Sequence, residues 1–132
     1  MANILVLDDV ADASVMIKRM LSRKGHNVEA FTEEQQAIAH AREHPVDLAI
    51  LDIKLLKMSG LEVLAELRRI APGMRAIMLT GYPTLETARQ ALELGADSYC
   101  VKPIDKDELE AAVASVLAGS PAGSPAGTQA AD

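Results

Sequence analysis

Side chains with carboxylate, hydroxyl or ammonium groups directly follow four of the short aliphatic runs in this sequence. Two carboxylates follow the first run and one follows the third, a hydroxyl follows the fourth, and an ammonium follows the fifth: Asp8, Asp9, Asp52, Thr80 and Lys102. Singly, these residues have ordinary explanations, because aspartate caps helices, aspartate and threonine occur in turns, and a lysine before proline can be a solvated charge. Their common position after runs of the same kind favours a shared site.

Three carboxylates gathered at one place would need a counter-charge. Two carboxylates about 4 Å apart repel by about 4 kcal/mol at an effective dielectric of about 20, so a group of three must bind a cation or take up protons. Oxygen ligands suit Mg²⁺, which also shares its ligand shell with phosphate groups. A carboxylate beside such a metal can attack phosphorus and form an acyl phosphate, while the metal and a lysine neutralise the transferred charge. The predicted chemistry is therefore phosphoryl transfer onto Asp52.

The five aliphatic runs alternate with longer helical patterns, which predicts a doubly wound α/β domain. The runs lie at residues 4–7, 28–31, 48–51, 76–79 and 99–101. Unbroken runs are typical of parallel strands that are covered on both faces, whereas the second run alternates and suits an edge strand. Strict alternation of strand and helix predicts a five-stranded parallel sheet with helices on both faces. Ligands of such sheets bind at the carboxyl ends of the strands, where the polar residues stand.

Helices are expected between the runs. Their apolar stripes comprise residues 13, 16, 17, 20 and 21, then 63, 64, 67, 70 and 71, and finally 109, 112, 113, 116 and 117. Capping-box patterns predict three helix starts, at Thr32 with Gln35, Ser59 with Glu62, and Asp105 with Glu108. Glycines predict four helix ends, at Gly25, Gly73, Gly95 and Gly119.

Two segments of different composition make up the 132 residues. Residues 1–119 carry all the strand and helix patterns and form one predicted domain. Residues 120–132 repeat Gly, Ser, Pro and Ala and are expected to be a flexible tail or linker. The tail either ends the protein or leads to a further domain.

Composition argues against several function classes. The formal net charge is −6, which disfavours a nucleic-acid interface and a polybasic membrane patch. The three aromatic residues offer little for stacking on bases or flavins. One cysteine, Cys100, favours a reducing compartment, and neither a signal pattern nor a run long enough to cross a membrane is apparent. We therefore expect a cytoplasmic protein.

Several sequence pieces together resemble the receiver domain of bacterial response regulators, which has the flavodoxin-like fold of the chemotaxis receiver. The pieces are Leu-Val-Leu-Asp-Asp at 5–9, Leu-Asp at 51–52, Met-Ser-Gly-Leu at 58–61, Met-Leu-Thr-Gly at 78–81, Leu-Gly-Ala at 94–96 and Tyr-Cys-Val-Lys-Pro at 99–103. The resemblance covers residues 2–118. It implies the strand order 2-1-3-4-5, which periodicity alone does not determine.

The resemblance also implies a role for each acidic residue. Asp9 and Asp52 would bind Mg²⁺ directly, Asp8 would hold a metal-bound water, and the backbone carbonyl of Lys54 would complete the protein ligands. Asp52 would accept a phosphoryl group from the phosphohistidine of a sensor kinase or phosphotransfer protein, which places the chain in a phosphorelay. Leu56 stands where the family often has proline, so the loop after Asp52 is expected to be less rigid.

A switch is implied as well. Lys102 would pair with a phosphoryl oxygen and join Pro103 through a cis bond, Thr80 would move to the phosphate, and Tyr99 would then turn inward. By the same resemblance, Lys54 and Tyr82 would occupy the two variable positions that tune the lifetime of the aspartyl phosphate in this family. The surface read by an output protein or domain, or by a second copy in a phosphorylation-dependent homodimer, would lie near Arg89, Tyr99 and Lys106.

Four alternatives remain at this point. A phosphatase of the haloacid-dehalogenase type needs a second aspartate two residues after its nucleophile, and Val10 stands there. A flavodoxin-like electron carrier needs a phosphate-binding loop where Asp8 and Asp9 would repel the phosphate. A degenerate receiver would act only as an interaction module, and a receiver could also be one half of a longer DNA-binding regulator. The favoured interpretation is a phosphoacceptor signalling domain, whose only catalysis is its own phosphotransfer and autodephosphorylation.

Overall fold

The computed structural model describes residues 2–55 and 58–119. Strands and helices alternate strictly along the chain: β1 (Asn3–Leu7), α1 (Ala11–Ser22), β2 (Asn27–Phe31), α2 (Glu34–Glu43), β3 (Leu48–Asp52), α3 (Gly60–Ile70), β4 (Arg75–Thr80), α4 (Leu85–Glu93), β5 (Ser98–Val101) and α5 (Lys106–Leu117). Leu56 and the tail at 120–132 lie outside the described residues, so the expectations about them stay predictions.

The five strands form one parallel sheet in the order β2-β1-β3-β4-β5, which confirms the predicted topology. The strand with the alternating pattern, β2, lies at an edge as predicted. From β1 the chain passes to β2 on one side, and then returns to the other side of β1 to form β3. The strand order therefore reverses between β1 and β3, which is where open α/β sheets bind ligands.

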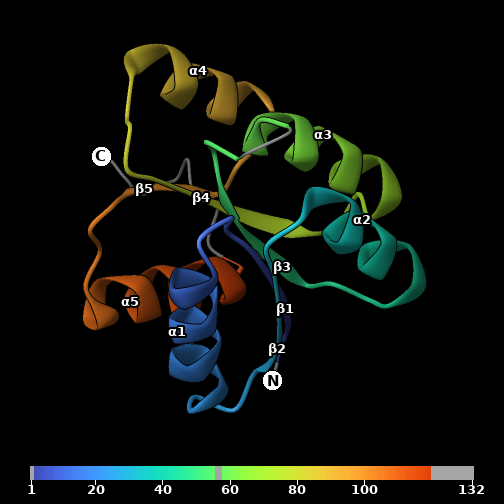
Figure 1. Cartoon of the computed structure of the whole chain (residues 1–132), viewed down its shortest axis with the longest axis vertical. Helices are drawn as coiled ribbons and strands as arrows, with labels where there is room; N and C mark the ends of the chain where they lie inside the picture. Colours follow the sequence, from blue (N-terminus) through green and yellow to red (C-terminus); the bar gives the residue numbers. More distant parts are fainter. Residues whose placement is uncertain (1, 56–57, 120–132) are drawn as a thin grey trace.

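Helices cover both faces of the sheet (Figure 1). On one face α1 and α5 bury apolar residues against the strands, namely Ile17, Leu21, Leu109, Val113 and Val116. On the other face α2, α3 and α4 contribute Ala37, Ile38, Val63, Leu64, Leu67 and Ala91. The central strands β1, β3 and β4 are thus enclosed between two layers of helix, which explains why they read as unbroken apolar runs.

Two of the three predicted capping boxes are confirmed, at the starts of α3 and α5. Ser59 and Glu62 cap α3, and Asp105 and Glu108 cap α5. The predicted start at Thr32 is wrong, because the residue that precedes α2 is Glu33 and its side chain makes no capping hydrogen bond. The structure instead shows an unpredicted box at α4, between Thr84 and Thr87. Threonine at the third helical position replaces the usual glutamate there, so the standard pattern does not find it.

The inward face of α1 differs by one position from the predicted stripe. Met16 is 64% exposed, whereas Ser14, Ile17 and Leu21 are buried. Burial of Ser14 is possible because its hydroxyl donates to the carbonyl of Ala11 at 2.9 Å. The inward face of α1 therefore includes Ser14, whose hydroxyl is hydrogen-bonded, and excludes Met16, which the apolar pattern had placed there.

Three of the four glycines expected after helices have the predicted left-handed backbone, with φ of 92° at Gly25, 81° at Gly95 and 86° at Gly119. Gly73 is an exception, because α3 already ends at Ile70 and Pro72 follows closely. None of the helices in the described part of the chain is long and apolar enough to cross a bilayer.

Candidate functional site

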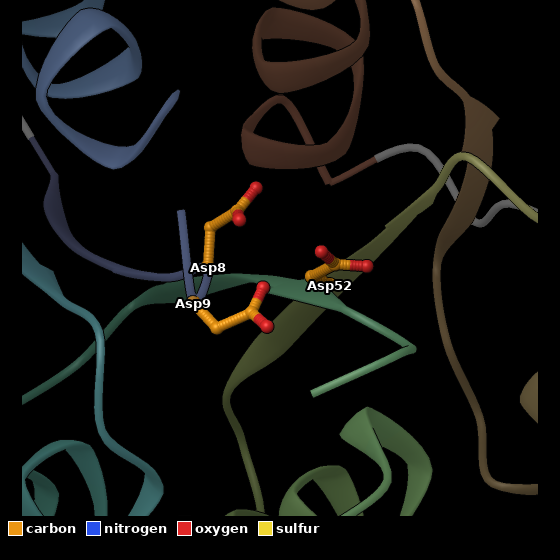
Figure 2. A group of neighbouring side chains, drawn as sticks. All are labelled: Asp8, Asp9 and Asp52. Carbon is orange, nitrogen blue, oxygen red and sulfur yellow. The ribbon is translucent and has the colours of Figure 1, made fainter. Parts of the chain in front are cut away.

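Three carboxylates meet at the carboxyl edge of the sheet. Asp8 and Asp9 follow β1, and Asp52 is the last residue of the neighbouring strand β3. One oxygen of each lies within 4.8 Å of the others, and Figure 2 shows the three side chains at the adjoining strand ends. Asp8 and Asp52 are buried, while Asp9 is half-buried. The predicted convergence of these residues is confirmed.

Lys102 reaches this acidic group from the end of β5. Its Nζ lies 2.6 Å from Oδ2 of Asp8 and 3.1 Å from Oδ2 of Asp52. The strand β5 lies two places from β3, so only a long side chain spans the distance. The bond from Lys102 to Pro103 is cis, as the family resemblance implied. Lys102 therefore links the two buried carboxylates directly.

Burial and charge both act on the ionisation of the site. Burial raises the pKa of Asp52, the hydrogen bond and charge of Lys102 offset part of that rise, and the charge of Asp8 adds to it. For Lys102, burial alone would lower the pKa, but hydrogen bonds and charges from Asp8 and Asp52 outweigh it and raise the pKa. Lys102 is accordingly a stable ammonium, whereas Asp52 holds its negative charge at a cost.

The donor set fits a hard divalent cation. Three carboxylates and one ammonium leave two negative charges in a partly buried site, and a divalent ion neutralises both. All the side-chain donors are carboxylate oxygens, which Mg²⁺ and Ca²⁺ prefer over nitrogen or sulfur ligands. Asp8, Asp9 and Asp52 can therefore hold such an ion.

The loop after Asp52 is fastened to the site by its backbone. The N–H of Lys54 donates to Oδ1 of Asp52 at 3.2 Å, and Lys54 pairs with Ser59 in an isolated antiparallel bridge. Behind this bridge, Gly60 donates its N–H to the carbonyl of Ile53 at 2.7 Å. A Cβ at Gly60 would lie 2.0 Å from the carbonyl oxygen of Asp52. Sequence reasoning assigned no role to Gly60, although this close approach explains why a residue without a side chain stands there.

Thr80 lies at the end of β4, between β3, which ends at Asp52, and β5, which Lys102 directly follows. It is fully buried, and its Oγ1 accepts a hydrogen bond from the N–H of Tyr82 at 3.0 Å. Lys54 lies over the Tyr82 ring, with Nζ 4.3 Å from the ring centroid. The two positions expected to tune the aspartyl phosphate therefore contact each other at the mouth of the site.

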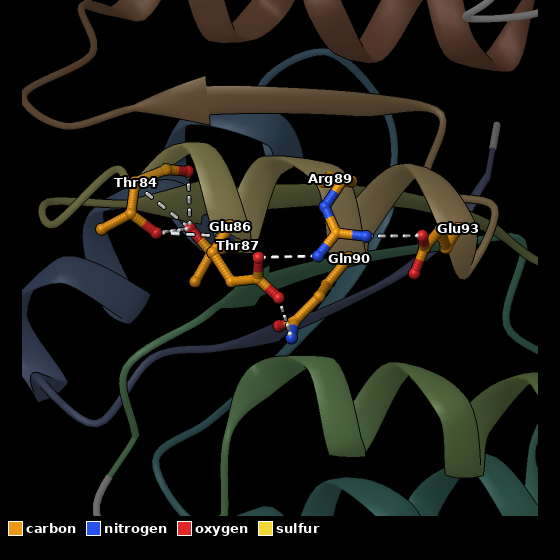
Figure 3. A network of polar contacts seen from close by, with 6 residues as sticks. All are labelled: Thr84, Glu86, Thr87, Arg89, Gln90 and Glu93. Atoms are coloured by element: carbon orange, nitrogen blue, oxygen red, sulfur yellow. Dashed lines mark hydrogen bonds and ion pairs between the residues drawn. The ribbon is translucent and has the colours of Figure 1, made fainter.

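Tyr99 is held by α4 rather than by Thr80. Its hydroxyl and Oγ1 of Thr87 lie 3.0 Å apart. Thr87 also belongs to the capping box of α4 with Thr84, which Figure 3 shows. A cavity of about 360 Å³ lies beside this contact and is lined by Ile53, Lys54, Leu55, Met58, Ser59, Thr80, Tyr82 and Thr87. The contact between Tyr99 and Thr87 thus joins β5 to α4, and Thr87 lines the same cavity as Lys54 and Ser59, which follow Asp52.

Replacing Tyr99 by phenylalanine should remove this contact and little else. We expect the free energy of unfolding, measured by urea denaturation, to fall by about 1 kcal/mol, the usual contribution of one hydrogen bond. Tyr82→Phe is the matched control, because the Tyr82 side chain is 67% exposed and should tolerate the loss of its hydroxyl. Equal stabilities for the two variants would contradict the assigned contact.

One contributing residue was missed by the sequence reasoning. Glu34, at the first position of α2, is only 4% exposed, and its Oε2 accepts a hydrogen bond from the N–H of Met58 at 3.0 Å. Neither spacing nor composition distinguishes it from the neighbouring glutamate, Glu33. Only the burial of its side chain and its contact 24 residues away reveal it.

Comparison with known proteins agrees with this geometry. The family described as "Response regulator receiver domain" matches residues 4–114. The transcriptional regulatory protein ZraR of Escherichia coli K12 is 34% identical over 116 residues, which cover 88% of this chain and 26% of ZraR. The chain therefore spans about a quarter of the length of that relative.

Solved structures give the same result. A CheY-like response regulator receiver domain protein from Methanospirillum hungatei is 33% identical with a TM-score of 0.87, covering 90% of this chain and 95% of its own. A response regulator from Burkholderia pseudomallei, solved with a phosphorylated aspartic acid, a calcium ion and citrate, is 31% identical with a TM-score of 0.80 and covers 95% of this chain and 76% of its own. This chain thus belongs to the response regulator receiver domain family and is a receiver of two-component signalling.

Proposed function

We propose that the chain accepts a phosphoryl group on Asp52, with Mg²⁺ held by Asp9 and Asp52, by Asp8 through a water, and by the backbone carbonyl of Lys54. The observation that carries the proposal is the placement of Lys102, whose Nζ lies 3.1 Å from Asp52 within a group of three carboxylates. The Burkholderia relative, which has a phosphorylated aspartic acid and a calcium ion, supports the same chemistry. A degenerate receiver is disfavoured because the acceptor and the lysine are both present and in contact.

The reaction requires little covalent work from the protein. An Oδ of Asp52 forms a bond to phosphorus, the phosphorus–nitrogen bond of a phosphohistidine breaks, and its electron pair leaves with the imidazole. Bound Mg²⁺ would neutralise charge on the transferred group. Lys102 would pair with a phosphoryl oxygen, and hydrolysis by water would return Asp52 to its free form. The chain thus catalyses only its own phosphotransfer and dephosphorylation, and we do not class it as an enzyme.

The phosphoryl group would act by shifting an equilibrium between two states of the α4 side of the domain. Thr80 would exchange its contact with Tyr82 for the phosphoryl group, and Tyr99 would leave Thr87 and turn inward. The helix α4 suits such a change because Ala91 is its one buried residue. Arg89 pairs with Glu86 and Glu93 at exposed positions (Figure 3), and exposed ion pairs of this kind add little stability.

Partners are proposed from the exposed surface. The proposed surface lies on α4 and β5 and includes three exposed apolar side chains, Leu85, Leu92 and Val101. Together with Arg89 and Lys106, they would bind an output protein, an output domain or a second phosphorylated copy. A sensor histidine kinase or phosphotransfer protein would supply the phosphoryl group and could bury Val10, Val15 and Met16 next to Asp9. These partners and the lone thiol Cys100 fit a cytoplasmic location.

Domain organisation follows the same proposal. Residues 1–119 would form the receiver and 120–132 the tail or linker. Because the chain covers 26% of ZraR, a transcriptional regulatory protein, the receiver half of a longer regulator is a second candidate for its context.

Binding of Mg²⁺ should stabilise the fold. Thermal denaturation with and without the metal is expected to show a rise of about 1.4 kcal/mol in the free energy of unfolding at about ten times the dissociation constant. Asp9→Asn should weaken this response, whereas Asp12→Asn, in the exposed first turn of α1, should leave it unchanged. A response that is equal in both variants would contradict the assigned ligands.

Intact-mass measurement tests the function itself. After incubation with Mg²⁺ and acetyl phosphate, the protein should gain the mass of one phosphoryl group. Asp52→Asn and chelation of the metal should each abolish the gain, while the melting temperature shows that Asp52→Asn remains folded. An unchanged mass of the wild-type protein under every condition would favour the degenerate receiver instead.

A further inference from the structure

We propose that Glu34 is a positioning residue for the metal and acceptor site, acting through Met58; this role rests on the proposed function. The contact that the described residues show for Glu34 is with Met58 and not with the carboxylates of the site. Its side chain is 4% exposed, although a buried carboxylate is costly unless it accepts hydrogen bonds. The observed hydrogen bond joins its Oε2 to the N–H of Met58 at 3.0 Å, across 24 residues of sequence.

A second contact joins Met58 to α2. Nε2 of Gln35 lies 3.9 Å from Sδ of Met58, within hydrogen-bonding distance for sulfur. The start of α2 therefore holds both the backbone and the side chain of Met58. The hydrogen bond that the Met58 N–H donates to the Glu34 carboxylate is charge-assisted and is the stronger of the two contacts.

A series of backbone contacts connects Met58 to Asp52. Met58 directly precedes Ser59, which pairs with Lys54 in the isolated antiparallel bridge. Lys54 in turn donates its N–H to Oδ1 of Asp52 at 3.2 Å. The same residue supplies the carbonyl that we propose as a metal ligand.

This anchor has a particular use in this chain. No proline stands among residues 53–59, so the backbone of the loop is not stiffened by its own sequence. The Glu34 carboxylate, which is fixed at the start of α2, can hold Met58 in place from outside this segment. Partners that orient metal ligands in this way typically change metal affinity by about ten-fold or more when they are removed.

Three variants distinguish the effect of the Glu34 hydrogen bond from the effects of its charge and its side-chain volume. Glu34→Met has a side chain of similar length but no acceptor, and Glu34→Gln keeps an acceptor oxygen without the charge. Glu33→Ala is the matched control, because Glu33 is exposed, is adjacent in sequence and makes no capping hydrogen bond. The readouts are the Mg²⁺ concentration that gives half-maximal phosphorylation by acetyl phosphate, and the amide exchange rate of Met58 measured by NMR.

We expect Glu34→Met to raise the half-saturating Mg²⁺ concentration roughly ten-fold and to speed exchange at Met58. Glu34→Gln should stay within about three-fold of the wild type, and Glu33→Ala should match it. A merely structural role would lower stability without changing the Mg²⁺ requirement of the folded fraction. Should Glu34→Met prove unfolded, faster amide exchange at Met58 in Glu34→Gln than in Glu33→Ala would support the charge-assisted hydrogen bond, and equal rates in the two variants would overturn it.

The possible failures are distinguishable. A wild-type protein without any Mg²⁺-dependent phosphorylation would overturn the proposed function, and this role with it. A normal wild-type response that Glu34→Met leaves unchanged would overturn only the role of Glu34. Equal weakening in Glu34→Met and Glu33→Ala would assign the effect to negative charge near α2 and likewise reject the positioning role.

Discussion

Lys102→Met is expected to slow phosphorylation of Asp52 about a hundred-fold while strengthening Mg²⁺ binding. The ammonium lies 3.1 Å from the acceptor carboxylate and 2.6 Å from Asp8, so it is in place to neutralise charge on the transferred group. Loss of one such preorganised donor usually costs about a hundred-fold or more in rate. The same ammonium repels a divalent cation, by about 1.7 kcal/mol at ~5 Å even at a dielectric of about 80, which corresponds to over ten-fold in affinity.

The opposite signs of the two effects make this a specific test. Phosphorylation rates would be followed by intact mass with acetyl phosphate, and Mg²⁺ affinity by calorimetry. Lys106→Met is the matched control, because Lys106 is an exposed lysine nearby in sequence that pairs with Glu110 at 3.4 Å. If Lys102→Met weakened both metal binding and phosphorylation, the lysine would be supporting the fold of the site rather than its chemistry.

Gly60→Ala is expected to lower the free energy of unfolding by about 3 kcal/mol and to weaken Mg²⁺ binding. An added Cβ would lie 2.0 Å from the carbonyl oxygen of Asp52 and 2.8 Å from the Cα of Ile53. Both atoms belong to the backbone, so no side-chain rotation relieves the overlap. The strand end that carries the acceptor must move instead, and forced shifts of this kind typically cost about 1–3 kcal/mol.

The chain offers a matched glycine for this test. A Cβ at Gly73 would meet nothing within 4 Å, and Gly73 does not have a left-handed backbone. Gly73→Ala should therefore be neutral or stabilise by about 0.4–1 kcal/mol, because alanine has less freedom in the unfolded chain. Urea denaturation of both variants gives the comparison. Equal stability of the two would mean that the close approach at Gly60 is not maintained in solution.

The strands and the chemistry-bearing residues were the most predictable parts of the protein. Aliphatic runs predicted all five strands to within one residue at each end. The signal is clearest for the central strands, because a parallel strand enclosed between helices must be apolar on both faces. Asp8, Asp9, Asp52, Thr80 and Lys102 were identified by their place after these runs. The helices were less predictable, since Thr32 does not begin α2 and Met16 faces outward.

The missed residues share a physical cause. Ser14 takes a core position because its hydroxyl finds the carbonyl of Ala11, and Glu34 is buried because it accepts a hydrogen bond from Met58. Tyr99 was identified from the sequence, but its contact with Thr87 of α4 was not. Hydropathy patterns describe a residue by its type, whereas burial of a polar group depends on the partner that it meets. Such partners are separated in sequence, so local patterns do not show them.

By itself, the sequence determined that strands alternate with helices and that acidic, hydroxyl and ammonium groups terminate the strands. Local patterns suffice for this, because periodicity and strand polarity place those groups at one edge of a parallel sheet. Only the tertiary structure decided that Lys102 bridges Asp8 and Asp52, that Gly60 presses against the acceptor backbone, and that Glu34 holds Met58. Those contacts join residues that are 8 to 94 positions apart in the sequence. The distances between them are set by the packing of whole elements, so no local sequence pattern shows them.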